Sequence, residues 1–307
     1  MRTWLAVLLV GCQPAIEPGV LARRGTAPPP EPGLLEDRST EFRFDGGQLD
    51  FEIYRAGDRI EQVVRNRYAV AVTLQWSLGS LANLEPMSPV QGTVVLPPAG
   101  VPLGAGTPVV LAELAQIDPG LRYRRELAFH ARFGDPAARP RSYLYALPYP
   151  HGLTFAVLQG FHGAFSHRGS NEYAVDFDCP VATPVTATRP GVVVAINASA
   201  QGSGTTAEYL DDRRANFVLI RHDDGTIGEY MHLAPSGVEV SAGQAVQRGQ
   251  EIALSGNTGF SSIPHLHFQV MTAAGDGVTK QSFPFELAVA PNRASVPVLG
   301  QRYAAWE

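Results

Sequence analysis

The chain has 307 residues, a formal net charge of −5 and 17% charged residues, together with 31 glycines and 25 prolines. This length allows two domains with separate cores, and the composition favours many short strands and turns over long helices. The negative net charge argues against nucleic acid as the main partner, because neutralising phosphates requires a basic face.

The N-terminus has the pattern of a secretory signal. Residues 1–11 contain one arginine and a short apolar run, which is too short to span a bilayer. The run ends in Leu-Val-Gly followed by Cys12, which resembles the lipobox of bacterial lipoproteins. That resemblance implies cleavage before Cys12 and acyl chains on it that anchor the protein to a membrane. The alternative is an ordinary cleaved signal or a misassigned start.

Two regions follow the signal before the histidine-rich part of the chain. Residues 12–37 are rich in Pro, Gly and Ala, which is typical of a spacer. Residues 38–148 contain about six to eight short β-rich runs separated by Gly, Pro, Asn and Asp, which predicts an immunoglobulin-like β-sandwich. His130 is the only histidine of that region and no acidic cluster is evident, so we expect the sandwich to have a structural or positioning role, with carbohydrate or partner binding as the alternative.

The region 149–293 predicts a compact antiparallel β-sheet domain, and residues 294–307 a C-terminal tail. The sequence His-Asp-Asp-Gly-Thr at 222–226, between two apolar runs, indicates a hairpin turn. No stretch has convincing helix caps. Cys179 has no evident partner, so we expect a buried, inert thiol. Most of the eight histidines gather in this domain: His151, His162, His167, His222, His232, His265 and His267.

Three segments of this domain together could form a metal site. They are "SHRGSNEYAVDFD", "EYMHL" and "PHLHF". Catalytic zinc usually takes three ligands from His, Asp or Glu and leaves one position open. In a β-strand, His265 and His267 point to the same face. An acidic residue in the apolar strand "YAVDF" is costly unless it is paired or coordinated, although spacing does not choose between Asp176 and Asp178.

The blocks "QGFHGAFSHRGSNEYAVDFDCPVATPVTATRPGVVV", "ANFVLIRHDDGTIGEYMHL" and "VSAGQAVQRGQEIALSGNTGFSSIPHLHFQV" resemble, in order, those of M23 family metallopeptidases, the lysostaphin/LytM-like peptidoglycan endopeptidases. The resemblance runs from about Gln159 to Val270. It implies one zinc ion per chain on His167, Asp176 and His267. It also implies that His232 and His265 line the catalytic water and the scissile carbonyl, and Asn216 is a weaker supporting candidate.

The resemblance has one departure, because the family's short form spaces its first two ligands as H-x-x-x-D, whereas His167 and Asp176 lie nine residues apart. His162 is therefore a second candidate for the first metal ligand, although we interpret it as a residue at the edge of the cleft and not as a ligand. We expect His265 to act as general base and His232 to hydrogen-bond the oxyanion, with the two roles open to exchange.

The sequence therefore predicts an all-β zinc endopeptidase that cuts peptide bonds in bacterial peptidoglycan, lipid-anchored in the envelope and facing the periplasm. The protein partners remain open. The alternative is a non-catalytic LytM-like protein that activates a cell-wall amidase, but all five expected positions hold metal-competent residues. A lipoyl-type carrier would need an exposed lysine at a turn to bear the cofactor. A serine hydrolase would need a G-x-S-x-G elbow, and the sequence contains no such motif. Co²⁺, Mn²⁺ or Cu²⁺ could occupy such a site in vitro.

Overall fold

The structure is a computed structural model that describes residues 33–41, 48–99 and 104–306. The expected signal peptide 1–11, the lipidation site Cys12 and nearly all of the expected spacer 12–37 lie outside these residues. The first described strand, β1, begins at Leu34, inside the stretch expected to be spacer. Within the described ranges, no helix is long and apolar enough to cross a membrane.

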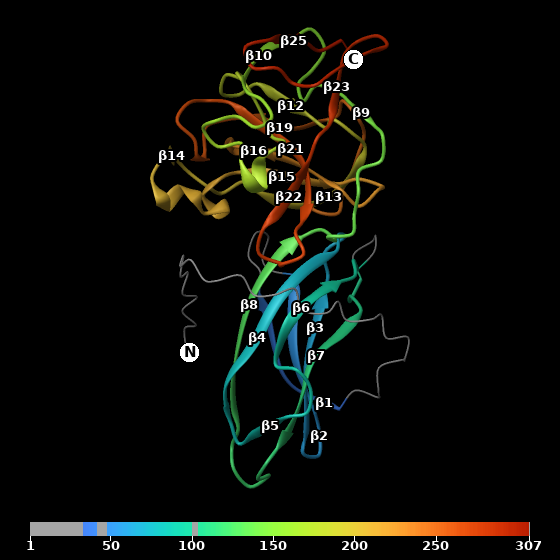
Figure 1. Ribbon diagram of the computed structural model, residues 1–307, viewed down its shortest axis with the longest axis vertical. Coiled ribbons are helices and arrows are strands. Elements are labelled where there is room, and N and C mark those ends of the chain that lie inside the picture. Colours follow the sequence, from blue (N-terminus) through green and yellow to red (C-terminus); the bar gives the residue numbers. More distant parts are fainter. Residues whose placement is uncertain (1–32, 42–47, 100–103, 307) are drawn as a thin grey trace.

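The chain folds almost entirely as strands, and it is arranged as two bodies stacked end to end (Figure 1). The first body consists of two sheets that face each other. The five-stranded sheet has the order β1-β2-β3-β7-β5, and the three-stranded sheet has the order β6-β4-β8. The strands are β1 (Leu34–Glu41), β2 (Leu49–Ala56), β3 (Arg59–Asn66), β4 (Val72–Ala82), β5 (Leu84–Pro86), β6 (Gln91–Leu96), β7 (Pro108–Gln116) and β8 (Arg124–Phe133).

Alternation of apolar and polar residues produces the core of this sandwich. In β4, Val72, Leu74, Trp76 and Leu78 are buried, and the residues between them are more polar. The rings of Phe51 in β2 and Phe129 in β8 lie 4.6 Å apart between the two sheets. A two-sheet sandwich is therefore present, and its immunoglobulin type stays a prediction.

The second body is built on a large antiparallel sheet with the order β18-β13-β15-β16-β21-β11-β10-β25, to which β22 adds beside β21. Its strands are β10 (Thr154–Gln159), β11 (Val175–Phe177), β13 (Gly191–Asn197), β15 (Phe217–Arg221), β16 (Ile227–Met231), β18 (Ala245–Val246), β21 (Leu266–Ala273), β22 (Lys280–Phe283) and β25 (Arg302–Ala304).

Smaller elements surround this sheet. One three-stranded sheet consists of β12 (Pro184–Thr186), β19 (Glu251–Ser255) and β17 (Leu233–Val238), and another consists of β24 (Arg293–Ser295), β23 (Glu286–Ala290) and β9 (Leu144–Tyr145). The described residues also form the parallel pair β14 (Ser203–Gly204) and β20 (Gly259–Phe260) and the short 3₁₀ helices η1 (Gly169–Asn171), η2 (Ala207–Leu210) and η3 (Asp212–Arg214).

The expected hairpin turn is confirmed, since residues 222–226 connect β15 to β16. The Asp224 carboxylate accepts hydrogen bonds from the Thr226 amide at 3.0 Å and from its hydroxyl at 2.6 Å. Gly225 has φ +84°, a conformation that side-chain-bearing residues rarely adopt. The all-β expectation for this part of the chain is likewise confirmed, as is the buried, free thiol of Cys179.

The large sheet separates two environments. Val218, Ile220, Tyr230, Phe268 and Val270 lie on one face, inside the main core of this body. The opposite face carries the alternate residues, among them Leu219, Met231 and His267. This second face holds the candidate site. The sheet under His267 is therefore packed against the hydrophobic core on its opposite face.

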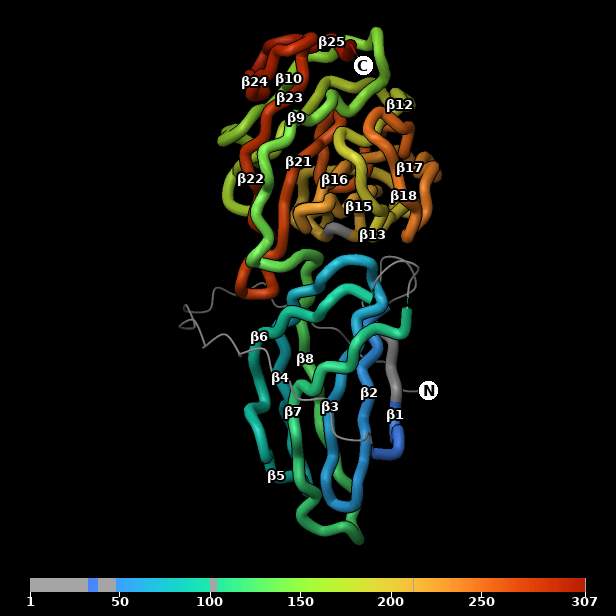
Figure 2. Tube along the Cα trace, turned by 90° about the vertical axis from the view of Figure 1, so that its right-hand side faces the viewer, coloured from blue at the N-terminus to red at the C-terminus, as the bar shows by residue number. Residues whose placement is uncertain are grey.

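The two bodies meet at the end of the β21–β22 hairpin, which reaches the ends of β4 and β8 (Figure 2). The Arg132 guanidinium donates to the Val278 carbonyl at 2.6 Å, and the Thr272 hydroxyl donates to the Asp135 carbonyl at 2.9 Å. Gly134 has φ +114°, and a Cβ there would lie 2.3 Å from the Thr272 hydroxyl oxygen. The strand that carries His267 is therefore tied at its far end to the sandwich.

Candidate metal centre

The His-Leu-His segment enters the site at the start of β21. His265 forms a bridge with Gly256 just before the strand, Leu266 is fully buried in the core, and His267 is paired with Met231 of β16 and Asp176 of β11. The two histidines therefore lie on the same side of the backbone, as the spacing predicts. Register alone brings Asp176 and His267 together from residues far apart in sequence.

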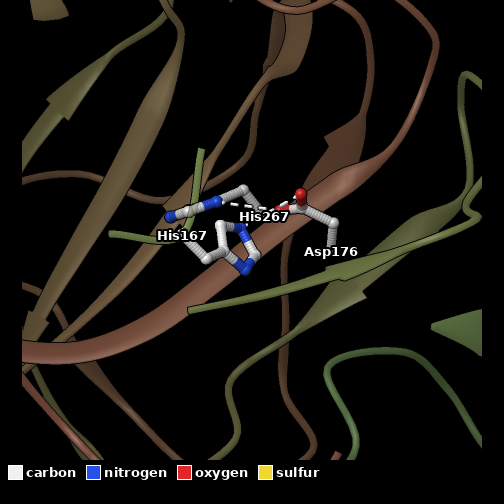
Figure 3. A group of neighbouring side chains, drawn as sticks. All are labelled: His167, Asp176 and His267. Atoms are coloured by element: carbon white, nitrogen blue, oxygen red, sulfur yellow. Dashed lines mark hydrogen bonds and ion pairs between the residues drawn. The ribbon is translucent and has the colours of Figure 1, made fainter. Parts of the chain in front are cut away.

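His167, Asp176 and His267 form a buried group whose candidate ligand atoms all lie within 4.8 Å of one another (Figure 3). The Asp176 carboxylate lies at its centre. One oxygen, Oδ1, is 2.9 Å from His267 Nδ1, and the other, Oδ2, is 3.1 Å from His167 Nε2. Two imidazoles and one carboxylate are a common donor set for catalytic zinc.

The hydrogen bonds of His167 show that this group fits a cation. Its Nδ1 lies 2.9 Å from the Gly160 carbonyl oxygen, which can only accept, so Nδ1 carries the proton. In the neutral ring, Nε2 then presents a lone pair to the Asp176 carboxylate, which also only accepts. Two buried acceptors at this distance repel unless a positive charge lies between them. A carbonyl on the far nitrogen is also the usual support for a metal-binding histidine.

Electrostatics keep the group in the protonation state that metal binding requires. Burial alone would raise the pKa of Asp176, but its contacts with the His167 and His267 rings hold that pKa well below its ordinary value. Burial lowers the pKa of His267, and the charges of Asp176 and Glu229 oppose that effect. At neutral pH Asp176 is therefore a carboxylate and His267 a neutral imidazole, the forms that bind a divalent cation.

His232 and His265 stand beside this group, with their ring centroids 4.6 Å apart. His232 Nδ1 is 2.7 Å from the Thr258 carbonyl, and His265 Nδ1 is 2.8 Å from the Ile263 carbonyl. Each ring thus holds its proton on Nδ1 and has Nε2 free to accept. His265 Nε2 lies 3.8 Å from Asp176 Oδ1, and burial lowers the pKa of His232 to about 3.

The remaining candidates from the sequence lie outside the cluster. Asp178 is exposed, whereas Asp176 is buried. The structure therefore favours Asp176 as the acidic ligand, a choice that the sequence spacing left open. His162 has a side chain that is 60% exposed and contacts Glu172, so His167, not His162, meets Asp176. Asn216 is buried and donates to the Ala200 and Leu233 carbonyls, so it supports the segment that follows His232 without touching the three candidate ligands.

The nine-residue spacing between His167 and Asp176 is accommodated by η1. Gln269 of β21 donates to the Asn171 side-chain oxygen at 3.2 Å, and the Tyr173 amide donates to the Ser282 hydroxyl at 3.2 Å. The additional residues therefore pack against β21 and β22 and leave His167 in place.

A buried ion pair lies two positions along the β16–β21 ladder from His267. Glu229 pairs with Gln269 in the β16–β21 register, on the same face as the pair of Met231 and His267. Lys280 contacts both Glu229 carboxylate oxygens at 3.0 and 3.1 Å, and the Gln269 amide donates to the same carboxylate. The ammonium neutralises this second buried carboxylate, whereas the described partners of Asp176 are imidazoles and an amide.

Sequence reasoning missed Gln159, whose carboxamide contacts Asp176 directly. Its Nε2 donates to Asp176 Oδ2 at 3.0 Å. The available signal was a lone polar residue at the end of the apolar run "TFAVL", immediately before the glycine that binds His167. The Thr258 carbonyl, which fixes the His232 ring, was also missed, because any residue type can supply a main-chain carbonyl.

Comparison with known proteins points to one family. Residues 170–280 match the model of Peptidase family M23, a range that contains Asp176, His232, His265 and His267 and begins three residues after His167. Glycyl-glycine endopeptidase ALE-1 of Staphylococcus capitis is 36% identical over 140 residues, which are 45% of this chain and 31% of that protein. Peptidoglycan DD-endopeptidase ShyA of Vibrio cholerae is 38% identical over 96 residues, 31% of this chain and 19% of that protein.

Among solved structures, the catalytic domain of lysostaphin from Staphylococcus simulans is 31% identical, with 46% of this chain and 86% of that chain covered and a TM-score of 0.28. The chain spans less than a third of the length of ALE-1 and of ShyA. The family match covers the strands that bring the carboxylate and three of the four histidines together. Residues 170–280 of the C-terminal body therefore form a Peptidase family M23 domain, and lysostaphin of Staphylococcus simulans is among its relatives.

Proposed function

We propose that the chain is a zinc-dependent endopeptidase that hydrolyses peptide bonds in bacterial peptidoglycan. The observation that carries the proposal is the buried Asp176 carboxylate facing the lone pair of His167 Nε2, with His267 on its other oxygen. The names of the relatives supply the substrate class, since they include a glycyl-glycine endopeptidase and a peptidoglycan DD-endopeptidase.

In this proposal His167, Asp176 and His267 hold the metal. When bound, one zinc ion would polarise the scissile carbonyl and lower the pKa of a water molecule. The chain's own contribution is to hold three donors in a buried site and to leave His232 and His265 free beside them.

We assign His265 as the general base, because its Nε2 is free to accept a proton and faces the carboxylate that holds the metal. After accepting the proton, the ring can donate it to the leaving amine. His232 can donate toward the oxyanion only when Nε2 is protonated, since its Nδ1 proton is bound to Thr258. Burial opposes that protonation in the free protein, whereas a developing negative charge next to the ring favours it.

The placement of the chain in the cell is also part of the proposal. Relatives whose names refer to peptidoglycan act where the cell wall is. We further propose that Cys12 carries a lipid anchor, that the expected spacer 12–37 serves as one up to the start of β1 at Leu34, and that the protein faces the periplasm. In this arrangement the sandwich, expected at 38–148, positions the peptidase domain, expected at 149–293, relative to the membrane.

The test combines metal content with digestion of purified sacculi by the full chain. The native protein should bind about one zinc ion per chain and release soluble fragments, whose masses identify the bond cut. His267→Ala should lose both properties. The matched control is His222→Gln, which alters another fully buried histidine outside the cluster and should keep both.

Retention of both properties by His267→Ala would contradict the proposal. Absence of hydrolysis by the native chain, together with stimulation of an added amidase, would support the non-catalytic alternative instead.

A further inference from the structure

We propose that Gln159 is a positioning residue that couples the first two metal ligands to each other. This inference rests on the metal site proposed above. Gln159 is the last residue of β10 and is 9% exposed. It is paired with Asp176 across the β10–β11 ladder, where the register shifts between Val157 and Gln159. Cross-strand partners share a face, so this irregularity places the carboxamide beside the carboxylate.

The orientation of the Gln159 amide is determined by its partners. Its Oε1 accepts hydrogen bonds from the main-chain amides of Phe165 at 2.9 Å and Ser166 at 3.1 Å. Main-chain N–H groups can only donate, so the oxygen must face them and the NH₂ group must face the other way. Nε2 then donates to Asp176 Oδ2 at 3.0 Å and to the Ser166 hydroxyl at 2.9 Å. Both donors and both acceptor sites of the carboxamide are used.

These four bonds join two segments that each supply a ligand. Ser166 directly precedes His167 on the loop after β10, and Asp176 lies in β11. The Asp176 oxygen that accepts from Gln159 is also the one 3.1 Å from His167 Nε2. One side chain therefore sets the rotation of the carboxylate and the position of the backbone beside His167.

The loop is shaped to enclose this amide. A Cβ on Gly163 would lie 2.1 Å from Gln159 Cγ and 2.7 Å from Cδ, so a glycine lets the loop pass directly over the side chain. The His167 amide in turn donates to the Gly163 carbonyl at 3.2 Å. Gly163 and Gln159 thus form one packing unit, and either residue can be used to disturb the bond to Asp176.

The test is the zinc dissociation constant of the folded full chain, measured by competition with a chromophoric chelator. Gln159→Met keeps the length of the side chain and removes all four hydrogen bonds. Partners of metal ligands typically contribute a factor of about 10–100 in metal affinity, and we expect a loss in that range. Gly163→Ala, which displaces the amide by steric overlap, should weaken zinc binding in the same direction.

The matched control is Gln62→Met in the sandwich. Gln62 is also buried and donates to two main-chain carbonyls, at 3.1 and 3.2 Å, but lies outside the site. It should lower the thermal stability of the metal-free protein while leaving the zinc dissociation constant unchanged. A role of Gln159 limited to stability would give this same result, so an affinity within twofold of native for Gln159→Met and Gly163→Ala would overturn the inference.

The two proposals fail in different ways. If the native chain binds no zinc, the proposed function fails. If the native chain and the Gln62→Met variant bind zinc, and the Gln159→Met and Gly163→Ala variants bind it equally well, only the coupling role of Gln159 fails. If Gln159→Met does not fold, the Gly163→Ala variant decides.

Discussion

Each of the two bodies buries a carboxylate on a strand of its sheet, and the two carboxylates have different partners. Glu52 of β2 is fully buried, receives the Arg65 guanidinium at 2.9 Å and accepts from the Tyr54 hydroxyl at 2.8 Å. Asp176 of β11 meets imidazoles and the Gln159 amide. An arginine brings a permanent positive charge, whereas neutral imidazoles leave the carboxylate charge uncompensated.

Burial alone therefore does not identify a functional carboxylate. Glu229 makes the same point on the face of the site itself, because Lys280 neutralises it as Arg65 neutralises Glu52. What distinguishes Asp176 is a set of partners that becomes complete only with a cation. The contrast can be tested by perturbing one carboxylate at a time.

The largest expected effect follows from removing the charge at each of the two positions. Asp176→Asn should abolish zinc binding and hydrolysis, because an amide is a poor ligand for zinc and cannot balance its charge. Glu52→Gln should keep the native zinc content and lower the free energy of unfolding by about 1–3 kcal/mol, since it weakens a buried hydrogen-bonded pair. Metal analysis and chemical denaturation of both variants provide the measurements. Loss of zinc from Glu52→Gln would remove the distinction.

The next effect separates chemistry from metal binding within the cluster. His265→Ala and His232→Ala should retain zinc but lower kcat by about 10²–10⁴-fold, the usual contribution of a positioned acid or base. The exposed His162 is the matched control, and His162→Ala should stay within a few-fold of native. Equal kcat for His265→Ala and native protein would exclude His265 as the base.

The effect of metal removal on stability should depend on Asp176 and not on Glu52. At free zinc about 1,000-fold above its dissociation constant, binding stabilises the folded state by about 4 kcal/mol. Chelation should therefore lower the unfolding temperature of the native protein and of Glu52→Gln by similar amounts. Asp176→Asn should show no such shift, and a shift as large as native in that variant would indicate that zinc binds elsewhere.

The smallest effect concerns pH and the buried His222. Burial, assisted by the nearby Arg189 charge, lowers its pKa to about 3, against an ordinary value of 6.5, although Asp224 and Asp223 oppose the shift. The unfolded chain binds this proton more tightly, so its contribution is absent above pH 6.5 and destabilises the fold progressively as pH falls toward 3. At pH 5 the loss from this residue is about 2 kcal/mol.

His222→Gln should therefore show a shallower loss of stability than the native protein between pH 6.5 and 5, measured by denaturant unfolding at each pH. Parallel slopes for the two proteins would mean that His222 does not control this range.

The sequence was informative where a polar or charged residue occurs in a buried strand, since burying it costs free energy. An aspartate between Val175 and Phe177, and two histidines around Leu266, are costly in buried strands, so their presence predicts a site. Asp178 could not be separated from Asp176 by spacing, because the irregular β10–β11 pairing that buries only one of them depends on contacts between distant strands. Gln159 was missed for the same reason, since its importance comes from an Asp176 oxygen 17 residues away in sequence.

The sequence could not predict how the longer spacing between His167 and Asp176 is absorbed. The 3₁₀ helix η1 has no side-chain cap, and it is held by Gln269 and Ser282 from β21 and β22. Its tertiary contacts, not a local propensity, define the segment. Similarly, the alternation in β4 predicts a half-buried strand but does not say which sheet faces it across the sandwich.

The ion pair of Glu229 and Lys280 gives this protein an unusual chemical property. Lys280 is the only lysine in the chain, and its side chain is 12% exposed beside a buried carboxylate. Amine-directed acylating reagents therefore have a single side-chain target, which is shielded while β22 stays paired with β21. The rate at which Lys280 is acylated would report how often the edge of the sheet next to His267 opens, without any substitution in the chain.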